Sequence, residues 1–181
     1  MLIREAVEAD FPEITDIYND VLLHSTAIYN DCPSTVEERI TWWRLRQEKQ
    51  YPVLVAKSNS GTIVGFGSFG DFRSWPGYRF TVEGTIHVQP SSRGKGVGTE
   101  LLKTLVLRAA ALGKHVMIAG VDSENTSSLR FLERFGFERA ALLRQVGYKF
   151  DRFLDLILLQ YWITAPCQSV TPANAKPALP C

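Results

Sequence analysis

The sequence predicts a single α/β domain in which helices flank a mixed central β-sheet. Strand and helix patterns follow one another in the order strand, helix, helix, three strands, helix, strand, helix and two strands, as in a layered α/β fold. The chain has 181 residues, of which 45% are hydrophobic, which is enough for one sizeable core. Since the sequence contains neither an internal repeat nor a second core, we expect residues 1–163 to form one domain.

The first strand and helix are predicted from a short apolar start and from helix-capping residues. Residues 2–4 form a brief strand. Asp10 is the expected N-cap of the helix that follows, because Pro12 lies in the first turn and Glu13 stands three residues after the cap. A loop over residues 24–33 ends this helix, since Asn, Asp and Pro interrupt its apolar spacing.

A capping box predicts the second helix. Thr35 is followed by Glu38, which is the spacing at which each side chain bonds the other's backbone N–H group. The helix runs from Val36 to about Lys49. Because Trp42 and Trp43 are adjacent, they cannot share one face, and we expect one of them to be exposed.

A hairpin follows, with strands over residues 53–57 and 63–69. Gly65 and Gly67 lie inside the second strand, which indicates either a bulge or the close approach of another segment. The loop over residues 71–78 contains an arginine and a tryptophan beside a strand end. It is either one wall of a binding site or a solvated turn.

The strand over residues 80–88 leads into a glycine-rich turn that opens a helix at residues 98–112. Gly94, Gly96 and Gly98 allow a ligand to approach the backbone, and the free N–H groups and dipole of a helix start favour a phosphate. The turn lacks the Ser or Thr that follows Gly-Lys in a P-loop and the spacing of the dinucleotide fingerprint. A glycine-rich turn without a ligand is the alternative.

The last elements are a buried strand, a short helix and two further strands. Residues 115–121 form a nearly continuous apolar run, as in a strand that is covered on both faces. The helix over residues 127–135 stops at Gly136. Two strands follow over residues 137–146 and 153–162.

Residues 164–181 differ in composition from the rest of the chain. They include four prolines and four alanines and have no apolar period. We expect them to form a flexible, Pro/Ala-rich C-terminal tail.

Composition excludes several classes of function. With 20 Lys and Arg against 19 Asp and Glu, the net charge is +1, so nothing points to nucleic acid or an anionic membrane. No apolar run approaches the roughly 18 residues of a membrane span, and the start lacks a signal-peptide pattern. The three cysteines and three histidines are isolated, which predicts no metal and a reducing, cytoplasmic location.

Two motifs resemble those of the GNAT superfamily of N-acetyltransferases. Arg93 to Gly98 reads Arg-x-x-Gly-x-Gly, which is similar to the acyl-coenzyme A loop of that family, and Asn125 to Phe137 resembles its Asn-x-x-Ala/Ser…Gly-Phe segment. The order of the elements is also that of the family, and the resemblance covers roughly Leu2 to Ile163. It implies a GNAT-like domain with acetyl-CoA as co-substrate.

Four further stretches resemble one subfamily, the phosphinothricin and methionine sulfoximine/sulfone N-acetyltransferases. They are Tyr51–Val55, Gly70–Glu83, Gly113–Met117 and Gln145–Phe150. This resemblance implies transfer of an acetyl group to the α-amine of a small amino acid, with detoxification as its biological meaning. It also implies a homodimer whose acceptor site lies near the interface.

The resemblance also implies how the coenzyme binds. Backbone N–H groups of the glycine-rich turn would cradle the pyrophosphate, the strand before it would pair with the pantetheine arm, and the Asn125 side chain would bond that arm. An N–H group of Ile86 or His87 would face the thioester oxygen. His87 is either structural or catalytic, and Arg93 and Lys95 either add charge or are solvated. The expected coenzyme-binding residues are Ile86, His87, Val88, Arg93, Gly94, Lys95, Gly96, Val97, Gly98, Thr99 and Asn125.

Glu83 is the candidate catalytic base. The amine arrives largely as an ammonium, and a carboxylate in an apolar-flanked strand has a raised pKa that suits a base. Glu83 could instead be exposed, pair with Arg79 or mainly bind the substrate ammonium. For the acceptor, Arg73 can bind a carboxylate through two hydrogen bonds. The resemblance adds Ser74, Trp75, Gly84 and Thr85 to the substrate-binding residues.

The sequence departs from the family at one position. Many members have a Tyr in the short helix that is thought to protonate the leaving thiolate, and Leu132 stands at that position. Tyr148 is available by residue type only, so no general acid is assigned. Two other functions remain open: acetylation of a peptide N-terminus, lysine or polyamine, and coenzyme A sensing without turnover. Arg73 favours a free amino acid, because a polyamine has no carboxylate to bind.

Overall fold

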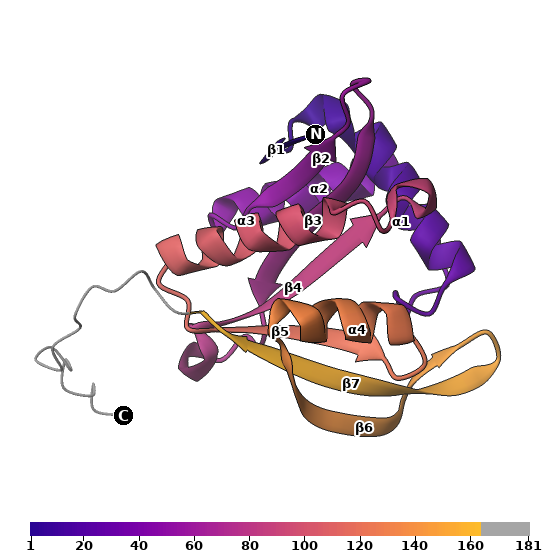
Figure 1. Cartoon of the computed structure of the whole chain (residues 1–181), viewed down its shortest axis with the longest axis vertical. Coiled ribbons are helices and arrows are strands. Elements are labelled where there is room, and N and C mark those ends of the chain that lie inside the picture. Colours follow the sequence, from indigo (N-terminus) through magenta and orange to yellow (C-terminus); the bar gives the residue numbers. More distant parts are fainter. Residues whose placement is uncertain (164–181) are drawn as a thin grey trace, which may run out of the picture.

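The fold has four helices and one seven-stranded mixed sheet, in the order of elements that the sequence predicts (Figure 1). The computed structural model describes residues 1–163, so the predicted tail at 164–181 lies outside the described residues. The sheet order is β1-β2-β3-β4-β5-β7-β6, and only β4 and β5 are parallel neighbours. The strands are β1 (Leu2–Glu5), β2 (Val53–Lys57), β3 (Ile63–Asp71), β4 (Thr81–Val88), β5 (Val116–Asp122), β6 (Glu138–Lys149) and β7 (Arg152–Trp162). The helices are α1 (Phe11–His24), α2 (Val36–Glu48), α3 (Val97–Ala111) and α4 (Thr126–Phe135).

The helices cover both faces of the sheet (Figure 1). α3 and α4 pack on one face, where Leu101, Leu105 and Leu129 join a core with Phe69 and Val82 of the sheet. α1 and α2 cover the other face over β2 and β3, where a second apolar cluster forms. Because side chains alternate along a strand, successive residues of β4 face the two helix pairs in turn.

Asp10 occupies the predicted N-cap position of α1, but its side chain does not cap the helix. The Asp10 side chain makes no capping hydrogen bond to α1. Its carboxylate accepts two hydrogen bonds from Arg4, at 2.6 and 2.7 Å, and one from the Val7 backbone N–H at 2.8 Å. The ion pair with Arg4 therefore takes the oxygens that a cap would use.

The capping box of α2 is confirmed. The Glu38 backbone N–H donates to Thr35 Oγ1 at 3.2 Å, and the Thr35 N–H donates to Glu38 Oε2 at 2.9 Å. The expectation that one tryptophan is exposed is wrong, since Trp42 and Trp43 are both half-buried and pack against the cluster under α1 and α2.

The two glycines inside β3 allow close approach, as predicted. A Cβ on Gly65 would lie 3.0 Å from the His87 carbonyl oxygen, and one on Gly67 would lie 3.0 Å from Leu105 of α3. These positions let β4 and α3 pack tightly against the strand, which fixes the end of β4.

The last hairpin is longer than predicted. Residues 147–149 belong to β6, and the turn consists of Phe150 and Asp151, whose φ angles are +51° and +56°. Lys149 is 2% exposed, and its ammonium donates to the carbonyl oxygens of residues 22, 25 and 28, two of them at 2.7 and 2.9 Å. This lysine ties the end of α1 and the loop after it to the hairpin.

Two findings concern whole classes of site. In residues 1–163 no helix is both long and apolar enough to cross a bilayer. Over the same residues, no three His, Cys, Asp or Glu side chains gather in a group that could hold a metal ion.

Candidate active site

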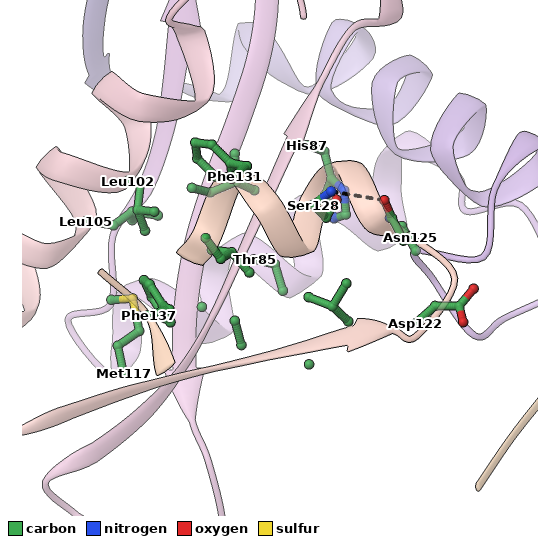
Figure 2. A pocket seen from close by; sticks show the side chains of 17 residues that line it. Thr85, His87, Leu102, Leu105, Met117, Asp122, Asn125, Ser128, Phe131 and Phe137 are labelled. Atoms are coloured by element: carbon green, nitrogen blue, oxygen red, sulfur yellow. Dashed lines mark hydrogen bonds between the residues drawn. The ribbon is translucent and has the colours of Figure 1, made fainter. Parts of the chain in front are cut away.

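The candidate site lies where the parallel strands β4 and β5 separate. The two strands pair only where Thr81, Val82 and Glu83 face residues 116–118 of β5. Beyond Glu83 they diverge, and a cavity of about 110 Å³ opens between residues 84–87 of β4 and residues 119–122 of β5. Figure 2 shows this cavity between the sheet and α4, with His87, Thr85, Asn125 and Phe131 around it.

A larger groove of about 1130 Å³ continues from this cavity to the surface. It is bounded by the end of β4, the glycine-rich turn and the start of α4. Of the predicted coenzyme-binding residues, all but Lys95 line the groove: Ile86, His87, Val88, Arg93, Gly94, Gly96, Val97, Gly98, Thr99 and Asn125. Lys95 is exposed beside it.

The turn needs glycine at two positions for its backbone conformation. Gly94 and Gly96 have φ angles of +71° and +83°, in the left-handed region that other residues enter at a cost. Gly96 is the N-cap of α3, so the unpaired N–H groups of the first helical turn face the groove. An anion can bind there without any side chain.

Gly98 has a different role, which is to let α4 approach α3. A Cβ at this position would lie 3.3 Å from the ring of Phe131. Phe131 lines both the cavity and the groove, so this contact sets the width of the passage between them.

The three residues at the end of β4 line the groove and are partly buried. Ile86 packs on the core under α3. The His87 ring lies 5.2 Å from Phe66 and 6.3 Å from Tyr18, between ring centres. Burial, assisted by the charges of Arg39 and Arg93, lowers the pKa of His87 to about 4, so its imidazole is neutral at pH 7. The surroundings of His87 fit a packing role.

Asn125 caps α4 with its side-chain oxygen. Its Oδ1 accepts from the Ser128 N–H at 3.1 Å and from the Ser127 hydroxyl at 2.9 Å (Figure 2). The amide nitrogen of the same side chain is left to face the cavity and groove that Asn125 lines. A carbonyl of a bound ligand could accept a hydrogen bond from it.

Glu83 lies at the point where the strands part. Its Oε1 is 3.4 Å from where a Cβ on Gly120 would be, so the carboxylate reaches from β4 over β5. Burial raises the pKa of Glu83 above its usual 4.5, while the positive charges of Arg73 and Arg46 act in the opposite direction. Arg79 is not its partner, because that guanidinium donates to the Pro76 carbonyl at 3.1 Å and lies over the Phe80 ring.

The loop between β3 and β4 contributes one charge to this region. The Arg73 guanidinium lies 5.2 Å from the Phe72 ring centre and is close enough to Glu83 to lower its pKa. Ser74 and Trp75 are exposed, with Trp75 at 73%. The structure therefore brings Arg73 toward Glu83 and leaves its two predicted neighbours in solvent.

Gly84 and Thr85 follow Glu83 along the cavity. A Cβ on Gly84 would lie 3.0 Å from the Met117 sulfur, so only glycine lets β5 pack so closely. Thr85 is exposed and lines the cavity on the side of Glu83.

No tyrosine takes the place of Leu132. Leu132 is 8% exposed and lines the cavity beside Phe131. Tyr148 lies on the β6–β7 hairpin, is 54% exposed and packs edge-to-face against Phe153 with ring centres 5.2 Å apart. It lines neither the cavity nor the groove.

Arg46 of α2 belongs to the surroundings of Glu83, although no motif in the sequence includes it. The charges of Arg46 and Glu83 act on each other, so the fold brings these two side chains near one another. Arg46 precedes Glu83 by 37 positions, so spacing along the sequence does not predict that the two residues are neighbours. Only the glycine at position 70, which pairs with Glu83 in the sheet register, indicates that a bulky side chain lies close by.

Together these parts form a site for group transfer. A turn of N–H groups can hold a phosphate, and a widened sheet edge can hold an extended arm. A carboxylate with a raised pKa, that of Glu83, directly precedes Gly84, the first β4 residue that lines the cavity. A basic side chain next to that carboxylate can bind an anionic second reactant.

Comparisons with known proteins agree with this arrangement. The acetyltransferase (GNAT) family model matches residues 11–137. An L-methionine sulfoximine/L-methionine sulfone acetyltransferase of Salmonella typhimurium is 46% identical over 160 residues, 88% of this chain and 93% of that protein. A phosphinothricin acetyltransferase of Sinorhizobium meliloti, solved with acetyl-CoA, has a TM-score of 0.86 at 35% identity and covers 94% of this chain and 95% of its own. A ribosomal-protein-alanine N-acetyltransferase of Brucella melitensis has a TM-score of 0.87 at 40% identity, with 90% and 99% coverage.

Proposed function

Since this chain belongs to the GNAT family of acetyltransferases, we propose that its acceptor is the α-amine of a small amino acid such as methionine sulfoximine, methionine sulfone or phosphinothricin. The chain is an N-acetyltransferase that uses acetyl-CoA as donor. The observation that carries the choice of acceptor is the pair of opposite charges next to the β4 residues that line the cavity. Glu83 can receive the α-ammonium, and Arg73 can bind the α-carboxylate.

The donor is held by the backbone more than by side chains. We assign the pyrophosphate to the N–H groups of residues 94–99, which the positive φ angles of Gly94 and Gly96 turn toward the groove. The pantetheine arm lies along residues 86–88, where β4 has lost its parallel partner and its backbone groups are free to pair. The Asn125 amide nitrogen bonds the arm from the opposite side, and Arg93 and Lys95 add positive charge at the entrance.

The acetyl group then sits beside Glu83. We assign Glu83 as the base that removes a proton from the ammonium, directly or through a water, so that the nitrogen lone pair can attack the thioester carbon. An N–H group of Ile86 or His87 stabilises the oxyanion that forms. The carbon–sulfur bond breaks, the nitrogen loses its second proton to solvent as the amide forms, and the thiolate takes a proton from solvent, since Leu132 and Tyr148 supply no acid at the cavity.

The acceptor site is completed by the remaining predicted residues. Gly84 and Thr85 border the amino acid on the strand side, and Ser74 and Trp75 close over it from the β3–β4 loop. In the described chain Trp75 is 73% exposed, which fits a side chain that becomes covered on binding or in an assembly.

We also propose that residues 1–163 are the acetyltransferase domain and that it works in the cytoplasm as a homodimer. The β6–β7 hairpin supports the dimer, because it leaves large apolar side chains exposed beside the site, namely Leu142, Val146, Tyr148, Phe150 and Phe153. The cysteines support the location, since they show no pattern of paired thiols.

A second acceptor class has one observation in its favour. The Brucella melitensis neighbour at 40% identity is named for acetylation of an alanine on a ribosomal protein. A peptide N-terminus also presents an α-amine, but it has no free α-carboxylate for Arg73.

The deciding experiment measures release of free thiol from acetyl-CoA over a panel of acceptors. We expect methionine sulfoximine, methionine sulfone and phosphinothricin to give the highest kcat/KM. Turnover of peptides but of none of these three would replace the amino-acid assignment with the peptide one. No turnover of any amine, with acetyl-CoA still bound, would point to a coenzyme sensor.

A further inference from the structure

One face of α2 carries a stack of charged and aromatic side chains above the acceptor end of the site. Arg39, Trp42 and Arg46 are spaced three and four residues apart, so they share one helix face. The guanidinium carbon of Arg39 lies 4.1 Å from the Trp42 ring centre, and that of Arg46 lies 5.5 Å from it. Stacking on the indole holds each planar guanidinium in a fixed orientation.

The two arginines of this stack point to different residues of β4. The charge of Arg39 acts on His87, which is packed between aromatic rings. The charge of Arg46 acts on Glu83, the candidate base. Arg46 is thus the member of the stack that faces the acceptor.

A glycine makes room for the Arg46 guanidinium. A Cβ on Gly70 of β3 would lie 1.6 Å from Arg46 Nη1, so the guanidinium occupies the space where a side chain would be. Gly70 is the register partner of Glu83 across the β3–β4 ladder. The guanidinium therefore lies on the sheet directly beside the strand residue that carries the carboxylate.

Despite this position, Arg46 has no close anionic partner. Its Nε is buried and unpaired. Of the ion pairs within 4.0 Å in residues 1–163, none includes Arg46. The nearby Asp71 is bound by Lys49 at 2.7 Å and by the Tyr51 hydroxyl. The Lys49–Asp71 bond also fixes the end of α2 to the end of β3. The backbone of Arg46 is therefore held in position, while its guanidinium still has N–H groups that can donate to a ligand.

We propose that Arg46 is a specificity-determining residue that donates hydrogen bonds to oxygen atoms at the end of the acceptor's side chain. This inference rests on the proposed function: with the α-ammonium at Glu83 and the α-carboxylate at Arg73, a second cation remains for the side chain. The acceptors that it selects are amino acids whose side chains end in a sulfone, sulfoximine, phosphinate or carboxylate oxygen. A thioether such as that of methionine offers Arg46 only a weak acceptor.

Kinetics with a matched pair of acceptors test the inference. Methionine sulfone and methionine differ only in the two sulfone oxygens. The ratio of their kcat/KM values therefore measures the preference of the enzyme for those oxygens, which is the preference assigned to Arg46. For Arg46→Gln we expect this ratio to fall roughly 10- to 100-fold, as for a lost charged hydrogen bond, mainly through KM for the sulfone. Any effect of Arg46→Gln that acts through the charge of Glu83 is common to both acceptors and cancels in the ratio, so methionine should lose less kcat/KM than methionine sulfone.

The matched control is Arg39→Gln. Arg39 is on the same helix, stacks on the same indole and also has a buried, unpaired Nε. A loss that came only from disturbing the stack would appear in this variant too. We expect Arg39→Gln to leave the sulfone-to-methionine ratio unchanged.

A second variant moves the guanidinium without removing it. In Gly70→Ala the new methyl group would take the place of Arg46 Nη1, and the flexible arginine side chain can give way. We expect the same fall in the ratio as in Arg46→Gln, and no further fall when the two changes are combined, because both break one contact.

Each outcome decides between the inference and its alternatives. Equal losses for methionine and methionine sulfone in Arg46→Gln would overturn the inference and leave Arg46 a structural or charge-balancing residue. The proposed function would survive that result, provided that the unmodified protein acetylates amino acids. If the unmodified protein acetylates peptides only, the proposed function is wrong, and the inference about Arg46, which rests on it, is overturned with it. Additive effects of Arg46→Gln and Gly70→Ala would also overturn the inference.

Discussion

At the scale of single residues, Glu83 combines burial with two nearby cations. Burial raises its pKa and strengthens it as a base, whereas Arg73 and Arg46 favour the ionised form that can accept a proton. The residue is therefore more basic than a glutamate in water, and the two cations limit this effect. This balance is what a base for an ammonium needs.

Glu83→Gln should remove the base and keep the shape of the site. We expect kcat to fall about 100- to 10,000-fold, as for loss of a general base. The dissociation constant for acetyl-CoA should not change, because the groove is formed by other residues. Thiol-release kinetics and calorimetric titration with the coenzyme measure the two quantities. Glu48→Gln, on the exposed end of α2, is the control. An unchanged kcat would show that Glu83 is not the base.

The raised pKa of Glu83 also predicts two pH dependences. Activity should rise with pH through a limb that lies above 4.5 and is missing in Glu83→Gln. The contribution of Glu83 to stability should instead fall as the pH rises. A carboxyl whose pKa is raised by folding ionises more readily in the unfolded chain, so ionisation favours unfolding. Glu83→Gln should then have a higher Tm than the unmodified protein at pH 8, and this advantage should vanish below the unfolded pKa. A Tm difference that grows on acidification would contradict the assignment.

Arg73→Ala separates acceptor binding from coenzyme binding. Since Arg73 is assigned to the α-carboxylate, KM for the amino acid should rise roughly 10- to 100-fold. The affinity for acetyl-CoA should stay the same. Arg44→Ala, at an exposed ion pair with Glu8, is the control. Equal weakening of both ligands would mean that Arg73 supports the fold and does not contact the acceptor.

At the scale of elements, the turn before α3 depends on backbone conformation. Gly96 has a φ of +83° and nothing within 4 Å of an added Cβ, so an alanine there is strained but not crowded. We expect Gly96→Ala to cost about 1–2 kcal/mol if the turn keeps its shape. If the turn relaxes, its N–H groups turn away from the groove and the acetyl-CoA Kd rises.

The control for this prediction is Gly77→Ala. Gly77 also has open space around it, but it has no positive φ. A coenzyme titration and a thermal melt on both variants measure the two costs. If Gly96→Ala binds and melts like Gly77→Ala, the conformation of the turn has no part in coenzyme binding.

The sequence predicted the elements well where the deciding contacts are local. The Thr35–Glu38 box needs only residues three positions apart, and it is present. Asp10 stands at the predicted N-cap position, but spacing could not show that its carboxylate binds Arg4 of β1 in place of the helix N–H groups. Residues 147–149 were predicted as a loop because glycine and lysine are poor strand signals, whereas in the fold Lys149 is held by the far end of α1.

The site was predictable to the same extent. Glu83 and the glycine-rich turn lie within one continuous stretch, so spacing and resemblance were enough to find them. Arg46 could not be found in this way, because its place depends on the register of Gly70 against Glu83 and on how α2 crosses the sheet. Sequence spacing contains neither relation.

At the scale of the whole molecule, Lys149 joins two distant parts of the chain. It is buried, and it satisfies three carbonyl oxygens at the end of α1 and in the loop after it. Lys149→Met should lower the free energy of unfolding by about 1–3 kcal/mol, because those oxygens lose their partner. Urea unfolding measures this loss, with the exposed Lys103→Met as the control. Equal stability of the two variants would show that water replaces the ammonium at no cost.

The separation of β4 and β5 has a mechanical consequence. The sheet consists of two leaves, β1 to β4 and β5 to β7, whose hydrogen-bonded seam is limited to residues 80–83 and 115–118. The two leaves can move relative to each other about this short seam. A ligand that pairs with the inner edge of one leaf and contacts the other restrains that motion, and in this sense it is a brace. At about 100 times its Kd, acetyl-CoA should stabilise the fold by about 2.7 kcal/mol.

Hydrogen exchange would show where the brace acts. We expect slower exchange at residues 84–88 and at residues 119–122 together, although only the first set is assigned to pair with the arm. Protection on one leaf alone would mean that the leaves move independently. Acetyl-CoA would then react as a substrate without linking the two leaves of the sheet.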